Sequence, residues 1–241
     1  MLKLFVGLDP NELIGFHVFV QSVLSRTDPN KVEIVPVCGS KGTASNAFNK
    51  ARFEIPFRCG FKGRAVWVDG SDMLCRGDIQ ELQDLLEPGC DVAVVKHEYS
   101  TKYPIKFLGQ SNDDYPRKNW SSVIVYDCGN YVWRKVTPEF VNQAKPSELH
   151  RFSFLKEDRI GELPKEWNWL SLEYDYNPHA KLVHMTVGLP CWEPYATLDP
   201  YAEEWRDELR KVNYFTRWEP GKPVSEEAEA IANGMLRVSG R

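Results

Sequence analysis

The sequence predicts an α/β fold in which a mostly parallel central sheet is flanked by helices. Short apolar segments rich in β-branched residues alternate with stretches of helical periodicity, which is the pattern of strand–helix–strand units. A chain of 241 residues, 42% of them hydrophobic, is long enough to bury a full core. We therefore expect one large domain, and its expected strands are residues 3–8, 32–37, 65–68, 91–95 and 122–126.

The first crossover helix is well specified by the sequence. Asp9 can cap a helix that starts with Pro10 and carries Glu12 at its third position. The helical spacing then predicts one apolar stripe facing the sheet. Its expected members are Leu13, Phe16, Val20 and Val23.

Later segments carry weaker signals. Residues 96–119 are polar, with tyrosines and lysines, and form a stretch too long for a plain connection, so we expect a functional loop there. We place the main domain at residues 1–195 and a C-terminal helical extension, packed on the same domain, at 196–241. Within the extension, the pattern of residues 201–211 predicts an acidic amphipathic helix. Residues 225–235 have a helix-forming composition but little apolar surface.

Composition excludes several classes of protein. A formal net charge of −4 argues against nucleic-acid binding, which favours a basic surplus or a basic face. No apolar run approaches the roughly 18 residues of a membrane span, and no signal peptide precedes the first strand, so we expect a cytoplasmic protein. The six cysteines form no C-x-x-C pair and are expected to be reduced thiols.

The most informative segment is an apolar strand, residues 65–68, that leads directly into two carboxylates. Asp69 and Asp72 are separated by Gly70 and Ser71. Residues three apart on a strand face opposite sides, so both carboxylates can reach one ion only if the chain turns at the glycine. A Mg²⁺ or Mn²⁺ with oxygen ligands at about 2.0 to 2.2 Å would remove their repulsion and leave positions open for phosphate oxygens. The alternative is an ordinary acidic turn.

A second short apolar strand ends at His184. An imidazole nitrogen beside carboxylates would shift selectivity from Mg²⁺ toward Mn²⁺, although a lone histidine at a strand end is commonly only a structural hydrogen-bonding group. Gly188 would let the backbone approach a phosphate, and Trp192 offers a flat face to a sugar or an anchor for the loop.

Together these segments resemble the GT-A type of nucleotide-sugar glycosyltransferases, especially family 8 and its bacterial and viral relatives. The similarity covers most of the chain and lies in the order of its pieces. These are residues 4–9, 51–56, 68–74, 77–79, 115–122, 149–152, 160–164, 167–168 and 184–192. The resemblance implies a single GT-A-like, Rossmann-like domain that binds a nucleoside diphosphate sugar through Mn²⁺ or Mg²⁺. A UDP-sugar is the favoured donor, and the sugar passes to a hydroxyl of a glycan or other acceptor.

The sequence departs from the family pattern in two places. The family's metal motif is Asp-x-Asp, whereas Asp69 and Asp72 are one residue further apart, so either Gly70 bulges or Asp72 alone touches the metal. The family's lysine near the C-terminal histidine, expected to contact the diphosphate, is missing between His184 and Trp192.

Other residues of the expected donor site follow from the resemblance and from topology, because ligands of open α/β sheets bind at the carboxyl ends of strands. Gly7, Leu8 and Asp9 end the first strand and are expected to contact the base or ribose. Lys106 or Arg52 is expected to replace the missing lysine. The alternatives are a solvated surface lysine and an arginine paired with a core carboxylate.

Three acids are candidates to act near the sugar. Asp127 follows the strand at 122–126, while Glu157 and Asp158 lie where related enzymes carry an acidic or amide motif that touches sugar or acceptor. We rank Asp158 slightly first, and each acid could instead be a helix cap or a surface residue. An inverting enzyme would need one of them as general base, whereas a retaining one, like the members of family 8, can work with none of them.

Two other functions fit parts of the sequence. One is a catalytically inactive carbohydrate- or nucleotide-binding protein of the same fold, which hydrolysis or transfer of labelled sugar nucleotides would exclude. The other is a sugar nucleotidyltransferase, which would favour a glycine-rich basic loop after the first strand. Residues 7–10, Gly-Leu-Asp-Pro, are acidic and form no such loop.

Overall fold

The structure is a computed structural model that describes residues 1–38, 48–106 and 109–212. The six strands of the main sheet are, in spatial order, β2 (Val32–Val37), β1 (Leu2–Gly7), β3 (Arg64–Val68), β8 (Val123–Asp127), β5 (Val92–Val94) and β9 (Ile160–Glu162). Their positions confirm the α/β fold and the five expected strands. Only β8 runs antiparallel to its two neighbours, and the other pairings are parallel.

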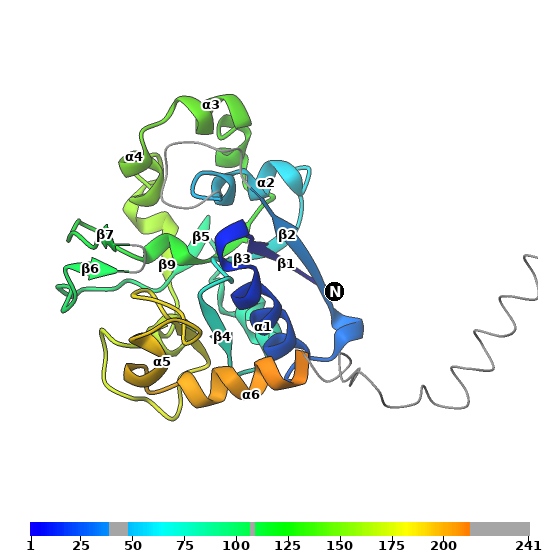
Figure 1. Ribbon diagram of the computed structural model, residues 1–241. Helices are drawn as coiled ribbons and strands as arrows, with labels where there is room; N and C mark the ends of the chain where they lie inside the picture. The colour runs from blue at the N-terminus through cyan, green and yellow to red at the C-terminus, as the bar shows by residue number, and fades with distance from the viewer. Residues whose placement is uncertain (39–47, 107–108, 213–241) are drawn as a thin grey trace, which may run out of the picture.

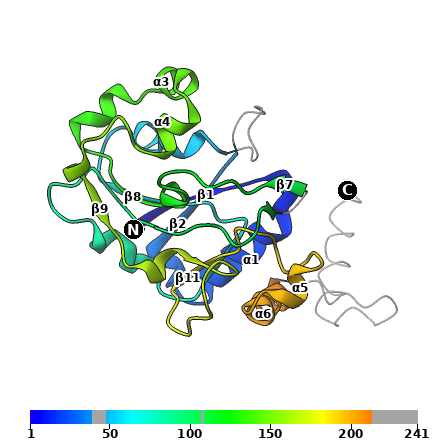
Figure 2. The ribbon, with the colours of Figure 1, turned by 90° about the vertical axis from the view of Figure 1, so that its left-hand side faces the viewer.

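Both faces of the main sheet are buried, as the continuous apolar strands predict. Side chains alternate between the faces with the period of a strand: in β3, Val66 and Val68 join one core cluster, whereas Ala65 and Trp67 join the other. Figures 1 and 2 both show the helix α1 (Leu13–Leu24) on one side of the sheet. The short helices on the other side are α2 (Ile55–Arg58), α3 (Pro138–Gln143) and α4 (Pro146–His150).

The helical segment that follows β1 begins at Asp9 as predicted, but the face that it buries against the core differs from the predicted one. Asp9 caps it through Oδ1, which accepts a hydrogen bond from the Asn11 amide at 2.9 Å. Residues Pro10–Glu12 form a separate 3₁₀ turn before α1 starts. Because a 3₁₀ turn has three residues rather than 3.6, it shifts the phase of the helix that follows. The predicted stripe is therefore wrong in part: Leu13 is 47% exposed. The buried face of α1 is Gly15, Val18, Phe19, Ser22 and Val23.

The helix α6 (Ala202–Val212) confirms the predicted amphipathic helix and packs beside α1 (Figure 1). Trp205 is fully buried on this helix, in a cluster with Val18. Glu208 is also buried, and its carboxylate pairs with Arg26 at 2.8 Å. The predicted helix at 225–235 lies outside the described residues. In the part of the chain that is described, no helix has the length and apolar character needed to cross a membrane.

Two small sheets complete the framework of the cavity described below. One has the order β10 (Trp169–Leu170), β11 (Leu182–His184) and β4 (Met73–Cys75). The other is a hairpin of β6 (Ile105–Lys106) and β7 (Gln110–Ser111), which lies within the segment 96–119. A short helix, α5 (Tyr195–Leu198), precedes α6.

Candidate active site

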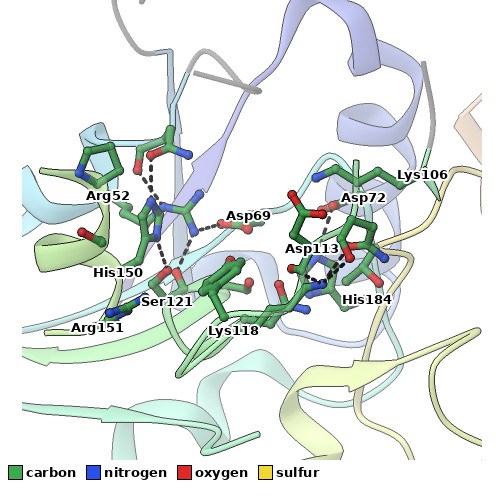
Figure 3. A pocket seen from close by; sticks show the side chains of 18 of the residues that line it. Arg52, Asp69, Asp72, Lys106, Asp113, Lys118, Ser121, His150, Arg151 and His184 are labelled. Carbon is green, nitrogen blue, oxygen red and sulfur yellow. Dashed lines mark hydrogen bonds and ion pairs between the residues drawn. The ribbon is translucent and has the colours of Figure 1, made fainter. Parts of the chain in front are cut away.

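A cavity of about 400 Å³ lies at the carboxyl end of β3, where the resemblance places the donor site (Figure 3). Its lining comes from segments that are far apart in the sequence. The lining residues are Asn49, Arg52, Asp69, Asp72, Lys106, Ser111, Asn112, Asp113, Tyr115, Lys118, Asn119, Ser121, Ser122, Pro146, Ser147, His150, Arg151, His184 and Thr186. Among them are five residues expected from the sequence: Arg52, Asp69, Asp72, Lys106 and His184.

A tight turn after β3 presents the two aspartates. Gly70 has φ of 77°, in the left-handed region that favours glycine, so the chain turns where the sequence predicted. The turn is closed by the Ser71 amide bonding to the Asp69 carbonyl and by the Met73 amide bonding to the Gly70 carbonyl. Ser71 also donates its hydroxyl to the Gly7 carbonyl at 3.1 Å, which ties the turn to the end of β1.

Strand pairing brings His184 to Asp72 across 112 residues of sequence. In the antiparallel pair of β4 and β11, His184 lies opposite Met73, and the Met185 amide donates to the Asp72 carbonyl at 2.8 Å. The His184 Nε2 atom is 3.1 Å from Asp72 Oδ2. The two distant strand ends therefore meet, as the sequence predicted.

Asn168 fixes the direction of the His184 ring. Its amide nitrogen donates to the Asn119 carbonyl at 3.0 Å, which leaves its Oδ1 to face His184 Nδ1 at 2.9 Å. Because an amide oxygen only accepts, Nδ1 carries the proton. The Nε2 atom then faces the Asp72 carboxylate either as a lone pair or as an imidazolium N–H. A neutral ring and an ionised carboxylate would repel each other there unless a cation lay between them.

Asp69 has a different set of partners. Its Oδ1 lies 2.6 Å from Arg52 Nη1 and accepts a hydrogen bond from Trp67 Nε1 at 3.0 Å. The Arg52 side chain is only 4% exposed. The structure thus shows the alternative considered for Arg52, a guanidinium paired with a buried carboxylate, although the arginine also lines the cavity.

A second buried acid, Glu12, is not part of the cavity lining but lies within electrostatic range of Asp72. Burial and the negative charges of Asp72, Asp9 and Asp69 raise the pKa of Glu12 to about 9, so this side chain is protonated at neutral pH. Burial alone would raise the pKa of Asp72 as well, but the adjacent His184 lowers it below its usual value, with help from Lys106. Asp72 is therefore the ionised carboxylate beside His184.

The donor atoms at Asp72 and His184 fit a divalent cation. Asp72 Oδ1 is buried and has no hydrogen-bond partner among the described residues. One carboxylate and one imidazole match the ligand preference of Mn²⁺, and of Mg²⁺ less well. Within residues 1–38, 48–106 and 109–212, no three His, Cys, Asp or Glu side chains are grouped as a closed metal site. The remaining ligands would have to come from water or substrate, as in an open site.

Gly7, Leu8 and Asp9, which were expected to contact the base or ribose of the donor, are not among the cavity-lining residues. A Cβ at Gly7 would be 2.7 Å from the Asp69 carbonyl, so this glycine permits close packing of β1 against the turn. The Leu8 amide bonds to the Val37 carbonyl, and the Asp9 carboxylate caps the first helical turn.

Gly188 and Trp192 are not cavity-lining residues either. A Cβ on Gly188 would come within 2.2 Å of the Tyr195 ring, so the glycine makes room for an aromatic side chain. Trp192 packs, partly buried, against the cluster that holds Trp205.

The three acids proposed to act near the sugar are also outside the lining. Because β8 is antiparallel to β3, its last residue, Asp127, pairs with Arg64 at the opposite end of β3 from Asp69. Glu157 is exposed and pairs with Arg117 at 2.5 Å, and Asp158 is exposed. The described structure does not bring any of these carboxylates to the cavity.

Several side chains in and around this site were not expected from the sequence. Asn168 belongs to a dipeptide that carries the family resemblance, but nothing in the sequence indicates that it orients His184. Glu12 is a helix-cap residue by pattern and a buried acid in the structure. Lys118 lines the cavity, and its ammonium donates to Asn112 Oδ1 at 2.8 Å and to the Asp113 carbonyl at 2.9 Å, so it orders the segment 96–119.

Solved structures with the same architecture are glycosyltransferases. The galactosyltransferase LgtC, solved in complex with donor and acceptor sugar analogs, superposes with a TM-score of 0.57 at 10% identity, over 95% of this chain and 99% of that one. The glycosyltransferase GlyE of Streptococcus pneumoniae gives a TM-score of 0.58 at 12% identity, over 93% of this chain and 65% of that one. The fold is thus that of the GT-A-type glycosyltransferases.

A closer relative comes from a plant. Protein CDI of Arabidopsis thaliana is 34% identical over 228 residues, which cover 88% of this chain and 87% of that protein. The chain belongs to the family of Protein CDI. No protein-family model matches the sequence.

Proposed function

We propose that this protein is a metal-dependent glycosyltransferase that moves a sugar from a nucleoside diphosphate sugar, in first place a UDP-sugar, to a hydroxyl acceptor. The observation that carries the proposal is the pair Asp72 and His184 in the cavity, with Nε2 and Oδ2 3.1 Å apart and Nδ1 held by Asn168. The fold and the resemblance to family 8 support sugar transfer with retention of configuration.

In this proposal Asp72 and His184 hold the Mn²⁺ or Mg²⁺, and Asp69 does not. When bound, the cation would act as a Lewis acid on the diphosphate leaving group. Asp69 is held instead by Arg52 and Trp67. The longer spacing, Asp-Gly-Ser-Asp, then separates two tasks that Asp-x-Asp combines: Asp72 binds the cation, and Asp69 positions Arg52 in the cavity wall.

Lys106 is the basic residue that we assign to the diphosphate. It lies in the hairpin strand β6, and Figure 3 shows it on the same side of the cavity as Asp72. Its positive charge contributes to lowering the pKa of Asp72, which places it within electrostatic range of the proposed cation site. A lysine there can act as a point charge on phosphate oxygens.

The direct test is a binding and turnover screen with the full chain. UDP-, GDP-, CDP- and dTDP-sugars are added with Mn²⁺, and the midpoint of thermal unfolding is measured, since a ligand of the folded state raises it. Labelled donors that raise the midpoint are then assayed for hydrolysis and transfer. Product formation would support the proposal. A folded protein that binds a donor but yields neither product would favour an inactive binding protein.

We predict opposite behaviour for two alanine variants of the aspartates. Asp72→Ala should abolish Mn²⁺-dependent nucleotide binding with little loss of stability. Asp69→Ala should keep the metal dependence but lower the free energy of unfolding by about 3 kcal/mol, because it leaves the buried Arg52 charge unpaired. Calorimetric titration and urea unfolding of both variants measure the two effects. Equal loss of metal binding in both variants would show that the two aspartates share the ion.

A further inference from the structure

The cavity has two ends of different chemistry. Figure 3 shows Asp72 and His184 on one side and Arg52, His150 and Arg151 on the other. The second side, which we call the α4 end, is formed by the residues around helix α4 and the segments facing it. Its members are Asn49, Arg52, Ser121, Ser147, His150 and Arg151.

The positive charge of Arg52 is already balanced. Its Nη1 atom lies 2.6 Å from Asp69 Oδ1 and also donates to the Ser121 carbonyl at 2.8 Å. The guanidinium lies over the rings of Phe48 and Trp67, with centroid distances of 5.5 and 5.4 Å. Held on all of these sides, Arg52 forms a fixed part of the wall.

His150 contributes no charge. Burial, together with the nearby Arg52 cation, lowers the pKa of His150 to about 3, so the ring is neutral. Its two nitrogens have partners: Nδ1 is 2.6 Å from Ser121 Oγ and Nε2 is 2.7 Å from Asn49 Oδ1. The ring therefore donates to the amide oxygen and accepts from the serine hydroxyl.

Arg151 differs from Arg52 and His150 because no described residue balances its charge. Within residues 1–38, 48–106 and 109–212, its buried Nε atom has no hydrogen-bond partner and its guanidinium forms no ion pair. The acid that follows in sequence, Glu157, pairs with Arg117 instead. A buried donor without an acceptor is uncommon in folded proteins and indicates a missing partner.

We propose that the α4 end binds a carboxylate group of a substrate and that Arg151 pairs with it. The inference rests on the proposed function and makes it more specific: either the transferred sugar or the acceptor is a uronic acid. One unbalanced guanidinium, beside the neutral His150 and the hydroxyl-bearing Ser147, matches a group of single negative charge. The planar guanidinium suits a carboxylate, which it can bind through two parallel hydrogen bonds.

Two binding comparisons, both in Mn²⁺, test this and separate the two sources of the carboxylate. The donor arm compares UDP-glucuronic acid with UDP-glucose. The first carries a carboxylate where the second carries a hydroxymethyl group. The acceptor arm adds UDP and compares a uronic acid disaccharide with its neutral counterpart. In one of the two arms we expect the acidic ligand to bind at least about tenfold more tightly than its neutral counterpart, as a charge-assisted pair would give.

Arg151→Gln should reduce that preference to less than about twofold, and Arg151→Lys should keep only part of it, because a lysine retains the charge but loses the planar geometry. Arg206→Gln is the matched control. It removes one arginine charge from α6, where Arg206 pairs with Glu203 outside the cavity lining, and should keep the full preference.

The outcomes separate this inference from the proposed function. Binding of UDP with Mn²⁺ but no preference for the acid in either arm would overturn the carboxylate site alone. A preference that survives in Arg151→Gln would overturn the role of Arg151. A protein that binds none of UDP, GDP, CDP and dTDP with Mn²⁺ would refute the proposed function, and the uronic acid assignment with it.

Discussion

His184→Ala is expected to weaken Mn²⁺-dependent nucleotide binding by about 100-fold or more while leaving the fold unchanged. The imidazole is one of two protein ligands in the proposed site, and replacement even of the partners that orient such ligands typically costs 10- to 100-fold in metal affinity. A 100-fold loss corresponds to about 2.7 kcal/mol. Calorimetric titration with UDP, with Mn²⁺ and with chelator, measures it, and circular dichroism checks the fold.

Two further variants show whether the effect belongs to the metal ligand. His179→Ala removes an exposed histidine outside the cavity and should bind like the unmodified chain. Asn168→Ala should give an intermediate loss of about tenfold, because the His184 ring loses the acceptor that fixes its Nδ1 proton. If His184→Ala bound Mn²⁺ and UDP as tightly as His179→Ala, the metal site would lie elsewhere.

Gly15→Ala is expected to cost about 2 to 3 kcal/mol in the free energy of unfolding and to lower activity as well. A Cβ at position 15 would lie 1.9 Å from the Ser71 carbonyl oxygen and 3.0 Å from Leu189 Cδ1. Helix α1 must therefore move away from the turn that carries Asp72, and overpacking of this kind typically costs 1 to 3 kcal/mol. In an exposed helix the same change would instead stabilise by about 1 kcal/mol.

Gly129→Ala is the matched control for Gly15→Ala. A Cβ there would meet only Asp127 Oδ1 at 3.4 Å, an ordinary contact, so the free energy of unfolding should change by less than about 0.5 kcal/mol. Urea unfolding of both variants gives the comparison. If both glycines tolerated alanine equally, α1 would not be packed directly on the Asp69–Asp72 turn.

Much of the fold could be predicted because its signals are local. The strands of the main sheet are short runs of apolar, β-branched residues, and a sheet buried on both faces requires such runs. A turn at Gly70 was the condition for bringing Asp69 and Asp72 to one ion; the glycine does turn in the left-handed region, but Asp69 pairs with Arg52 instead. The phase of α1 was not predictable from the apolar pattern, because the 3₁₀ turn at Pro10–Glu12 shifts it by a fraction of a turn.

The site could be predicted only where strand ends determine it. Asp72 and His184 meet because β4 and β11 pair in a fixed register. The direction of β8 carries no signal in the sequence, so Asp127 was expected at the cavity and lies at the other end of β3. The partners of Asn168, Arg52 and Arg151 depend on contacts between distant segments, which composition and spacing do not reveal.

The anomalous scattering of Mn²⁺ in crystals grown with Mn²⁺ and UDP would show whether Asp72 and His184 bind one cation. We expect one strong anomalous peak within ligand distance of Asp72 and His184 Nε2, about 2.0 to 2.3 Å from each, with Asp69 still bound to Arg52. An anomalous peak at any other place, or a His184 ring turned away from a bound Mn²⁺, would contradict it.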